Sequence, residues 1–399
     1  MKDKILDSRH YDIGRGSVDI CCTNLGAIVR RLFVLLGILV LLAAGCGSDD
    51  NDTSTTSGST AVDATTPNDP EPVVVPDEPS DVTLTLVTND AFSGVAYLLD
   101  AFTAETGIGL DLVAGGDAGA LVNQAILTKG NPLGDVLYGF DNTFLSRVLD
   151  AEITIPYESS AAAVIPAEMQ LDPTYNVTAV DFGDVCINYD KAWFADNGVA
   201  VPEELSDLTS PEYSGLLTVE NPATSSPGLA FMMATIAEFG EDGWLDFWAG
   251  LADNDVDVVS GWDEAYYASF TQYGGPRPLV VSYASSPPAE VIFAETPIDV
   301  APTGVMESSC FRQIEYIAIL EGTEHEAEAQ QLIDWWLSDS MQAELPLNYF
   351  VFPVNPATAL PQEFIDHTII PESPHTLDPA AIAANREEWL DEWTSTVLR

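Results

Sequence analysis

Residues 82–141 read VTLTLVTNDAFSGVAYLLDAFTAETGIGLDLVAGGDAGALVNQAILTKGNPLGDVLYGFD, and this stretch decides the fold. Val82, Leu84 and Leu86 alternate with threonine, which is typical of a strand. The pattern then predicts, in order, a helix over 95–102, a strand over 110–113, a helix over 117–128 and a strand over 136–138. Strands that alternate with helices in this way predict a parallel sheet with helices on both faces, and therefore the α/β fold class.

An acidic residue follows each of these three strands, namely Asp90, Asp117 and Asp141. Ligands of parallel sheets bind beyond the carboxyl ends of the strands. We therefore expect these three side chains to lie at one edge of the sheet, as candidate binding residues.

The rest of the chain repeats this pattern. Further strands are predicted over 216–219, 256–260, 279–282 and 313–320, and further helices over 229–239, 325–337 and 379–397. The chain has 399 residues, of which 46% are hydrophobic, and is therefore long enough to form two or more lobes.

The composition argues against several classes of protein. Asp and Glu number 63 against 13 Lys and Arg, which gives a formal net charge of -50. Such a surface repels nucleic acid and anionic lipid and mildly attracts cations. The sequence has no Gly-Lys-Ser/Thr phosphate loop and no Gly-x-Ser-x-Gly motif, and its four histidines lack metal-ligand spacing. We therefore expect a binding protein rather than an enzyme, with no cofactor, no resident metal and no nucleic-acid partner.

The N-terminal region indicates export. Arg30 and Arg31 precede the apolar run LFVLLGILVLLAA of residues 32–44, which is typical of a secretory signal and short for a membrane span. The run leads into Ala-Ala-Gly-Cys46, which resembles a bacterial lipobox and implies removal of the signal peptide 1–45 and a lipid on Cys46. Residues 46–81 are acidic and rich in Pro and Thr, and are predicted to form a disordered tether. A plain membrane anchor is the alternative.

Two cysteines remain in the body of the exported chain, Cys186 and Cys310. Cys21 and Cys22 lie in the segment expected to be removed. Two cysteines in an oxidising compartment predict one disulfide.

Residues 224–228 read TSSPG and precede a predicted helix. Ser226 suits the N-cap and Pro227 the first helical position. The motif is either an ordinary cap or a place where free amides at the helix start, with Ser225 and Ser226, bind an anion or a hydroxyl.

Residues 261–267 read GWDEAYY and follow the strand predicted over 256–260. Trp262 is therefore expected in a loop, where a binding role is favoured over a core role. Tyr266 lies at helical spacing and is expected to pack, although the pair Tyr266-Tyr267 resembles the tyrosines of ferric-ion-binding proteins. Tyr283 is expected to point from the end of the strand over 279–282, and Phe350 lies in a loop bounded by prolines; core packing is the alternative for both.

Together these motifs resemble one family, the thiamine-binding proteins of bacterial ABC importers. The resemblance extends from about Val82 to the C-terminus. The matching stretches are 90–92 (DAF), 134–137 (GDVL) with 141–142 (DN), 224–229 (TSSPGL), 261–266 (GWDEAY), 281–283 (VSY) with 286–287 (SP), 352–354 (FPV) and 386–393 (REEWLDEW). Each stretch is short, and their order and spacing make the match specific.

The resemblance implies a two-lobed periplasmic-binding-protein fold of type II. Each lobe is expected to be a mainly parallel sheet flanked by helices, with the ligand cleft between the lobes. The implied ranges are 82–186 for lobe one, 187–310 for lobe two, and 311–399 for a return to lobe one with C-terminal helices. Cys186 and Cys310 are placed at the crossovers between the lobes.

The resemblance also implies a set of ligand-binding residues, which by matching motif are Asp90, Asp117, Ser225, Trp262 and Tyr283. Phe350 stands where the family usually has tryptophan, and Asp141, Ser226 and Tyr266 complete the candidate set. The chain departs from the family at Asn89 and at Pro288-Ala289, where tyrosines are usual. The loss of aromatic area leaves another heterocyclic cation open as the ligand.

We therefore expect an extracytoplasmic lipoprotein, anchored to the cell membrane, that captures thiamine or its phosphates as a monomer. Its other expected partners are an ABC permease and the ATPase of that importer. Ferric ion, a polyamine or another organic cation are alternative ligands. A surface-tethered hydrolase and a structural adhesin are the alternatives from other classes, and titration with thiamine separates them from the binding protein.

Overall fold

The computed structural model describes residues 81–398. The expected signal peptide, the lipidated Cys46 and the tether up to residue 80 lie outside the described residues. Within 81–398, none of the helices combines the length and the apolar character that a membrane span requires.

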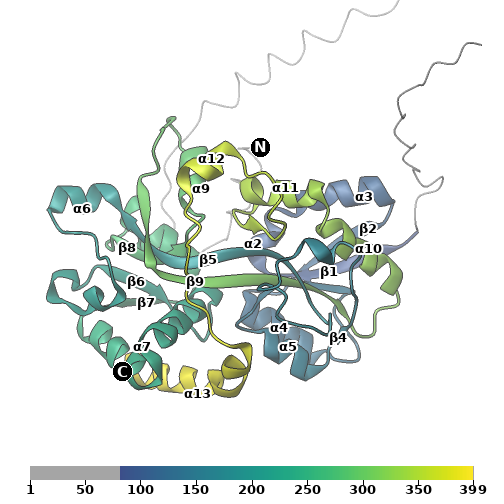
Figure 1. Ribbon diagram of the computed structural model, residues 1–399, viewed down its shortest axis with the longest axis horizontal. Helices are drawn as coiled ribbons and strands as arrows, with labels where there is room; N and C mark the ends of the chain where they lie inside the picture. Colours follow the sequence, from purple (N-terminus) through teal and green to yellow (C-terminus); the bar gives the residue numbers. More distant parts are fainter. Residues whose placement is uncertain (1–80, 399) are drawn as a thin grey trace, which may run out of the picture. The chain divides into compact units, whose positions relative to one another are not determined.

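One ten-stranded sheet runs through the described chain (Figure 1). Its strand order is β2 (Gly109–Ala114), β1 (Thr83–Thr88), β3 (Val136–Asp141), β9 (Thr303–Leu320), β5 (Thr178–Asp190), β8 (Leu279–Tyr283), β6 (Leu217–Glu220) and β7 (Asp257–Val259). Strands β1, β2 and β3 are parallel to each other at one end, and β6, β7 and β8 at the other. The predicted parallel pairing of 82–141 is therefore confirmed. We call the half around β1–β3 lobe one and the half around β6–β8 lobe two.

Two long strands connect the lobes. β5 and β9 are antiparallel to each other, from the pair Thr178 and Ile317 to the pair Asp190 and Thr303. The first part of β5 also pairs with the short β10 (Phe352–Pro353) in lobe one, and the last part pairs with β8 in lobe two. Both lobes therefore share one continuous backbone ladder, and the proposed lobe boundaries after residues 186 and 310 fall inside these two strands.

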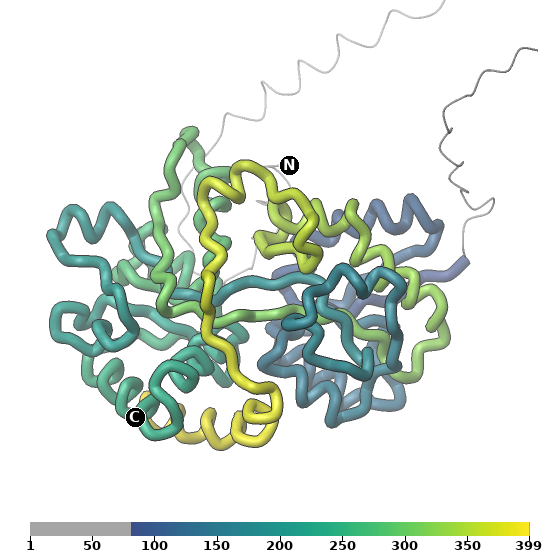
Figure 2. The backbone as a smooth tube through the Cα atoms, in the orientation of Figure 1, coloured from purple at the N-terminus to yellow at the C-terminus, as the bar shows by residue number. Residues whose placement is uncertain are grey.

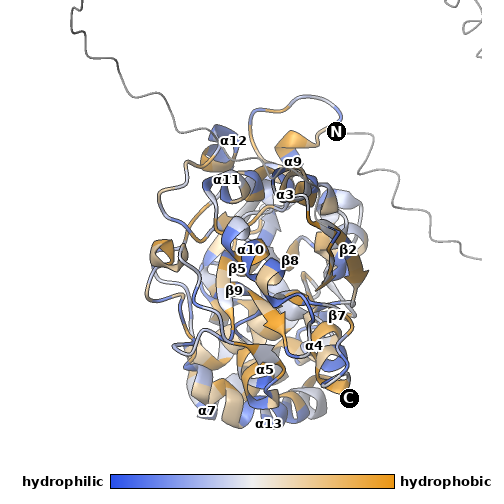
Figure 3. Cartoon of the chain, turned by 90° about the vertical axis from the view of Figure 1, so that its right-hand side faces the viewer, coloured by the Kyte–Doolittle hydropathy of each residue, from blue (hydrophilic) through white to orange (hydrophobic). Residues whose placement is uncertain are grey.

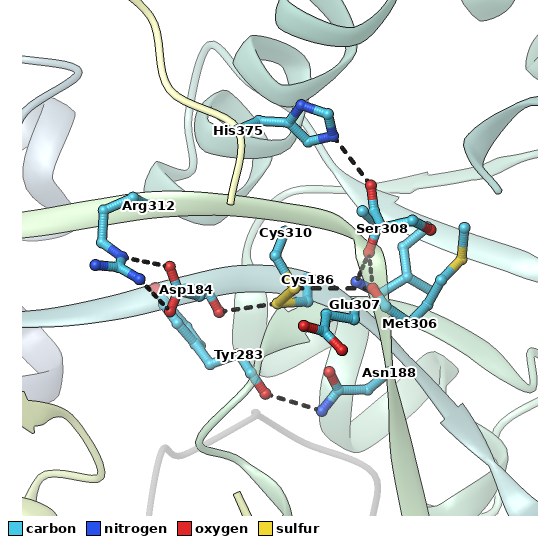
Figure 4. Close-up of a disulfide and its surroundings, with 12 residues drawn as sticks. Asp184, Cys186, Asn188, Tyr283, Met306, Glu307, Ser308, Cys310, Arg312 and His375 are labelled. Atoms are coloured by element: carbon cyan, nitrogen blue, oxygen red, sulfur yellow. Dashed lines mark hydrogen bonds and ion pairs between the residues drawn. A yellow bond between two sulfur atoms is a disulfide. The ribbon is translucent and has the colours of Figure 1, made fainter. Parts of the chain in front are cut away.

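Cys186 and Cys310 form a disulfide in the middle of this ladder, with a sulfur–sulfur distance of 2.05 Å (Figure 4). The ladder is irregular there, because Val185 pairs with Phe311 whereas Ile187 pairs with Met306. Next to the bridge, the guanidinium of Arg312 donates to the carboxylate of Asp184 at 2.6 Å. The disulfide thus joins the two connecting strands at the point where their regular pairing is interrupted.

Helices cover the sheet on both sides. In lobe one these are α3 (Asp100–Thr106), α4 (Ala118–Leu127), α5 (Leu145–Ala151), α10 (Glu326–Trp336) and α11 (Asp339–Asn348). Lobe two carries α6 (Lys191–Asn197), α9 (Pro287–Ile292) and the long α7 (Ser226–Asp253), and α12 (Gln362–His367) packs against α9. The C-terminal α13 (Pro379–Val397) packs against both α5 and α7, so the last helix spans the two lobes (Figures 1 and 2). Figure 3 shows hydrophobic colour on strands such as β2 and β9, and both hydrophilic and hydrophobic segments along the helices.

Three predicted elements differ from the structure. The strand predicted over 313–320 is the second part of β9, which begins at Thr303. The prediction missed the first part because the polar residues 307–309 interrupt its apolar pattern. The helix predicted over 229–239 is the first part of α7, which is interrupted at Gly240 with φ of 69° and continues to Asp253. The loop expected at Trp262 is wrong, since Trp262 opens the short helix α8 (Trp262–Glu264).

Candidate functional site

The first turn of α7 contacts the strand ends of lobe one. The amide of Ser226 donates to Oδ1 of Asp117 at 3.2 Å, and the Ser226 hydroxyl bonds Oδ2 of Asp141. Gln313 of β9 donates from Nε2 to Oδ2 of Asp141 at 2.7 Å and to the Ser226 hydroxyl at 2.6 Å. The N-cap is Ser225, whose hydroxyl accepts from the amide of Gly228. The N-cap predicted at Ser226 is therefore wrong by one residue. Ser226 instead forms hydrogen bonds from lobe two to Asp117 and Asp141 of lobe one.

The acidic residues at the strand ends of lobe one lie together, as the parallel sheet requires. Asp90 accepts from the amide of Gly116 at 3.1 Å, and Asp117 caps α4 by accepting from Ala118 at 2.6 Å. Burial raises the pKa of Asp117, its two amide donors lower it, and the charges of Asp141 and Asp90 raise it, which together give a pKa of about 6. This edge of lobe one therefore concentrates negative charge opposite lobe two.

Trp262 belongs to an aromatic cluster in lobe two. Its ring is half-buried and stacks on Tyr266, with centroids 4.8 Å apart and planes 18° apart. Its indole nitrogen donates to the hydroxyl of Ser282 at 2.9 Å. Tyr266 is only 3% exposed, and its hydroxyl donates to Glu290 at 2.6 Å. The buried ring of Tyr266 thus fixes one face of the half-buried Trp262.

Tyr283 lies between the acidic groups of the two lobes. It ends β8, and it is half-buried. Burial raises its pKa well above the ordinary value, with further increases from Glu315, Asp117, Asp141 and Glu220. Tyr283 therefore lies close to carboxyl groups from both lobes while keeping part of its surface exposed.

Phe350 lies on the lobe one side of this region and faces lobe two. Its φ is 60°, and its ring makes an edge contact with Phe293, the residue that follows α9, at 5.7 Å between centroids. The structure therefore brings Asp117, Asp141 and Ser226 into direct contact and sets Trp262, Tyr283 and Phe350 around lobe two and its border with lobe one. Asp90 is exposed at the rim.

Sequence reasoning missed an acidic pair on the connecting strands, of which Asp181 is buried and Glu315 is half-buried. Asp181 of β5 and Glu315 of β9 are direct partners in the ladder, and the hydroxyl of Tyr138 donates to Asp181 at 2.8 Å and to Glu315 at 3.2 Å. Burial raises the pKa of both carboxyl groups. The signal in the sequence was an acidic residue in the middle of an apolar strand, in TAVDFG and in QIEYIAI. Two further residues were also missed: Tyr349, whose pKa is raised by burial and by Glu315 and Asp181, and Glu220, which lies near Asp117.

The fold and this arrangement define a solute-binding protein. Residues 131–371 match the family of bacterial extracellular solute-binding proteins, and the chain belongs to that family. Such a protein works outside the cytoplasm as the substrate-binding part of an ABC-type transporter, and its relatives are transport proteins rather than enzymes.

The chain is similar to several thiamine-binding periplasmic proteins. The one from Escherichia coli (strain K12) is 28% identical over 321 residues, which cover 79% of this chain and 94% of the relative. The one from Brucella suis is 24% identical over 323 residues, covering 79% and 92%. A solved structure of a periplasmic thiamin binding protein has a TM-score of 0.69 and 25% identity, covering 79% of this chain and 96% of that chain. Iron-bound HitA from Pseudomonas aeruginosa shares the fold, with a TM-score of 0.64 and 20% identity. The expected type II two-lobed fold is confirmed.

Proposed function

We propose that this protein captures thiamine and delivers it to the permease and ATPase of an ABC importer. The observation that carries the proposal is the placement of two groups of residues on the two lobes. Lobe one has the acidic edge of Asp90, Asp117 and Asp141, and lobe two has the stacked rings of Trp262 and Tyr266, which we call the aromatic platform. Asp117 and Asp141 contact the first turn of α7, and Trp262 and Tyr283 lie in the same lobe as that turn. Thiamine carries a thiazolium cation beside a flat aminopyrimidine, so it needs negative charge and an aromatic face together.

In this proposal each lobe contributes a different kind of contact to the ligand. Lobe one supplies carboxylates that balance the cation and accept hydrogen bonds from the amino group. Lobe two supplies Trp262, whose plane is fixed by Tyr266 and Ser282. A ligand held between the lobes stabilises the closed arrangement, in which Ser226 touches Asp117 and Asp141, and closure is what presents the ligand to the permease.

Unphosphorylated thiamine is the favoured form. The start of α7 could bind a phosphate through its free amides. The amide of Ser226 already donates to Asp117, and its hydroxyl already bonds Asp141. A phosphate placed there would displace these bonds and meet two carboxylates of its own sign, so we expect thiamine diphosphate to bind more weakly than thiamine.

Ferric ion is the second candidate, because iron-binding proteins share the fold and Tyr266-Tyr267 resembles their tyrosine pair. The hydroxyl of Tyr266 donates to Glu290 inside lobe two, and the ring of Tyr266 stacks on the ring of Trp262. Using Tyr266 as an iron ligand would break both contacts. Among the described residues, no group of three or more His, Cys, Asp and Glu side chains is arranged to hold a metal ion.

Calorimetric titration of the purified protein tests the proposal. We expect one thiamine per chain, weaker binding of thiamine diphosphate, and no heat from spermidine. Ferric citrate should produce no visible tyrosinate absorption. Saturable binding of iron or spermidine with no response to thiamine would replace the proposed ligand.

We also propose that Cys46 carries a lipid and that the chain acts as a monomer held at the cell membrane. Support comes from the apolar run and lipobox-like sequence before Cys46. Metabolic labelling of wild-type protein and of a Cys46→Ala variant with a fatty-acid analogue tests this, and we expect label only on the wild type.

A further inference from the structure

Glu220 is a buried carboxyl group without a partner. It ends β6 and is 0% exposed. Among the residues that the structure describes, neither of its carboxyl oxygens makes a hydrogen bond. A buried polar group in this state costs free energy. Other buried polar atoms of the described chain also lack a partner, but Glu220 is the one carboxyl group there with both oxygens in this state.

Other buried acids of this chain show the contrast. Asp184 is held by the guanidinium of Arg312 at 2.6 Å. Glu290 accepts from the hydroxyls of Tyr266 and Thr303, both at 2.6 Å. Each of these carboxylates has a structural function in the lobes, whereas Glu220 lacks one.

The position of Glu220 is between the start of α7 and the Trp262 cluster. A Cβ atom added to Gly228 would lie 2.6 Å from the carbonyl oxygen of Glu220, so the first turn of α7 packs directly on this residue. Strands β6 and β8 run parallel, with Thr218 beside Val280. Two residues further along the same two strands, beyond this pairing, are Glu220 and Ser282, and Ser282 accepts the hydrogen bond from the indole of Trp262.

The carboxyl group also lies close to the acidic edge of lobe one. Burial raises the pKa of Glu220 well above the ordinary value. The charge of Asp117, across the lobe border, raises it further, and Glu220 in turn contributes to the raised pKa of Tyr283. Glu220 and Asp117 therefore form a pair of acidic groups, one from each lobe, next to the proposed aromatic platform.

We infer that Glu220 is a ligand-binding residue that accepts hydrogen bonds from, and balances the charge of, a cationic heteroaromatic amine held between the lobes. This inference rests on the proposed function, because it takes the same site as the site of capture. A cation lying on Trp262 supplies the partner that the protein itself does not, and it offsets the repulsion between Glu220 and Asp117. None of the motifs that resemble the thiamine-binding family includes Glu220, so it is a candidate determinant of the specificity of this chain.

The test uses Glu220→Leu and Glu220→Gln in the full chain, titrated with thiamine and melted without ligand. We expect Glu220→Leu to weaken thiamine binding at least about 30-fold, which corresponds to about 2 kcal/mol. Glu220→Gln should lie between Glu220→Leu and wild type, since it keeps an acceptor but not the charge. Without ligand, Glu220→Leu should melt at a higher temperature than wild type, because an unpartnered buried polar group has been removed.

Two control variants distinguish a role of Glu220 in ligand binding from the effect of removing any buried or any exposed carboxylate. Asp184→Asn removes a partnered buried carboxylate and should lower the melting temperature. Glu241→Gln removes one exposed charge of lobe two and should leave thiamine affinity unchanged. A lower melting temperature of Glu220→Leu with unchanged affinity would show that Glu220 is structural and would overturn the inference.

Failure of the proposed function has a different signature. In that case wild type itself does not respond to thiamine, and the same variants are titrated with spermidine instead. The melting experiment needs no ligand, so a fall in melting temperature for both Glu220 variants defeats the inference whichever ligand is bound.

Discussion

At the scale of single residues, the site depends on how each side chain is held. Trp262 is fixed on one face by Tyr266 and at its indole nitrogen by Ser282. Tyr266 is fixed in turn by Glu290. The plane of the tryptophan is therefore set before a ligand arrives, and little conformational entropy is lost on binding.

Trp262→Ala should weaken thiamine binding at least about 30-fold, because a desolvated cation–π contact contributes about 2 kcal/mol or more. The ring is half-buried, so the loss of stability should be smaller than the ~3–5 kcal/mol of a core tryptophan. Titration calorimetry and thermal melting measure the two effects. Trp193→Ala is the matched control, since Trp193 is also half-buried and lies on α6, and it should not change affinity. A collapsed melting temperature with unchanged affinity would assign Trp262 to the core.

The affinity for thiamine should fall as the pH is lowered from about 7.5 to about 5.5, because Asp117, with a pKa of about 6, loses its charge in this range. A raised pKa also means that the folded protein binds the proton more tightly than the unfolded chain. The ligand-free protein should therefore lose the contribution of Asp117 to stability as the pH rises through about 6. Asp117→Asn should flatten both profiles. An unchanged pH profile in that variant would assign the titration to another group.

The sequence was sufficient to predict that Asp90, Asp117 and Asp141 lie near one another, because strand ends of a parallel sheet share one edge. It was not sufficient to select Glu220, which ends a strand in the same way. With 63 acidic residues, an additional glutamate carries no signal by itself. Its distinguishing property is the lack of a hydrogen-bond partner when buried, and this depends on tertiary packing.

At the scale of the elements, β5 and β9 determine how the lobes are connected. Their sequences obscured their full length, because Asp181, Gly183 and Asp184 interrupt the apolar pattern of β5. In the structure both carboxyl groups have tertiary partners: the hydroxyl of Tyr138 donates to Oδ2 of Asp181, and the guanidinium of Arg312 donates to Asp184. Local periodicity cannot reveal such partners, which explains why helices were located more accurately than the connecting strands.

Replacing both Cys186 and Cys310 by alanine should lower the free energy of unfolding by about 2–4 kcal/mol, because the bridge restricts the unfolded chain. Thiamine affinity should change little, since the bridge joins neighbouring strands of one ladder and does not span the lobes at the ligand site. Urea unfolding and calorimetry measure the two quantities. In a chain that begins at Ser80, which holds only these two cysteines, a thiol assay without reductant should find no free thiol. Two reactive thiols there would contradict the pairing.

At the scale of the whole molecule, residues 81–398 contain the complete sheet, and α13 packs against helices of both lobes. The C-terminal helix is thus part of the folded body. Trp393 of α13 is buried against Trp248 of α7, with ring centroids 5.4 Å apart.

A chain that begins at Ser80 should bind thiamine with the same affinity as one that begins at Cys46. Residues 47–79 are acidic and lack the apolar periodicity with which a segment packs on a protein. Calorimetric titration of the two chains side by side measures the difference. A loss of affinity beyond a few-fold in the shorter chain would place part of residues 46–79 in the binding site.

The shared ladder of β5 and β9 also determines at which stage of synthesis the sheet can be completed. Neither lobe can complete its sheet until β9 has been synthesised, and the disulfide that locks the ladder joins cysteines 124 residues apart. Contacts between such distant segments form slowly. The pairing that unites the two lobes is therefore a late event in the life of the chain, since most of the sequence must already be present before β9 can meet β5.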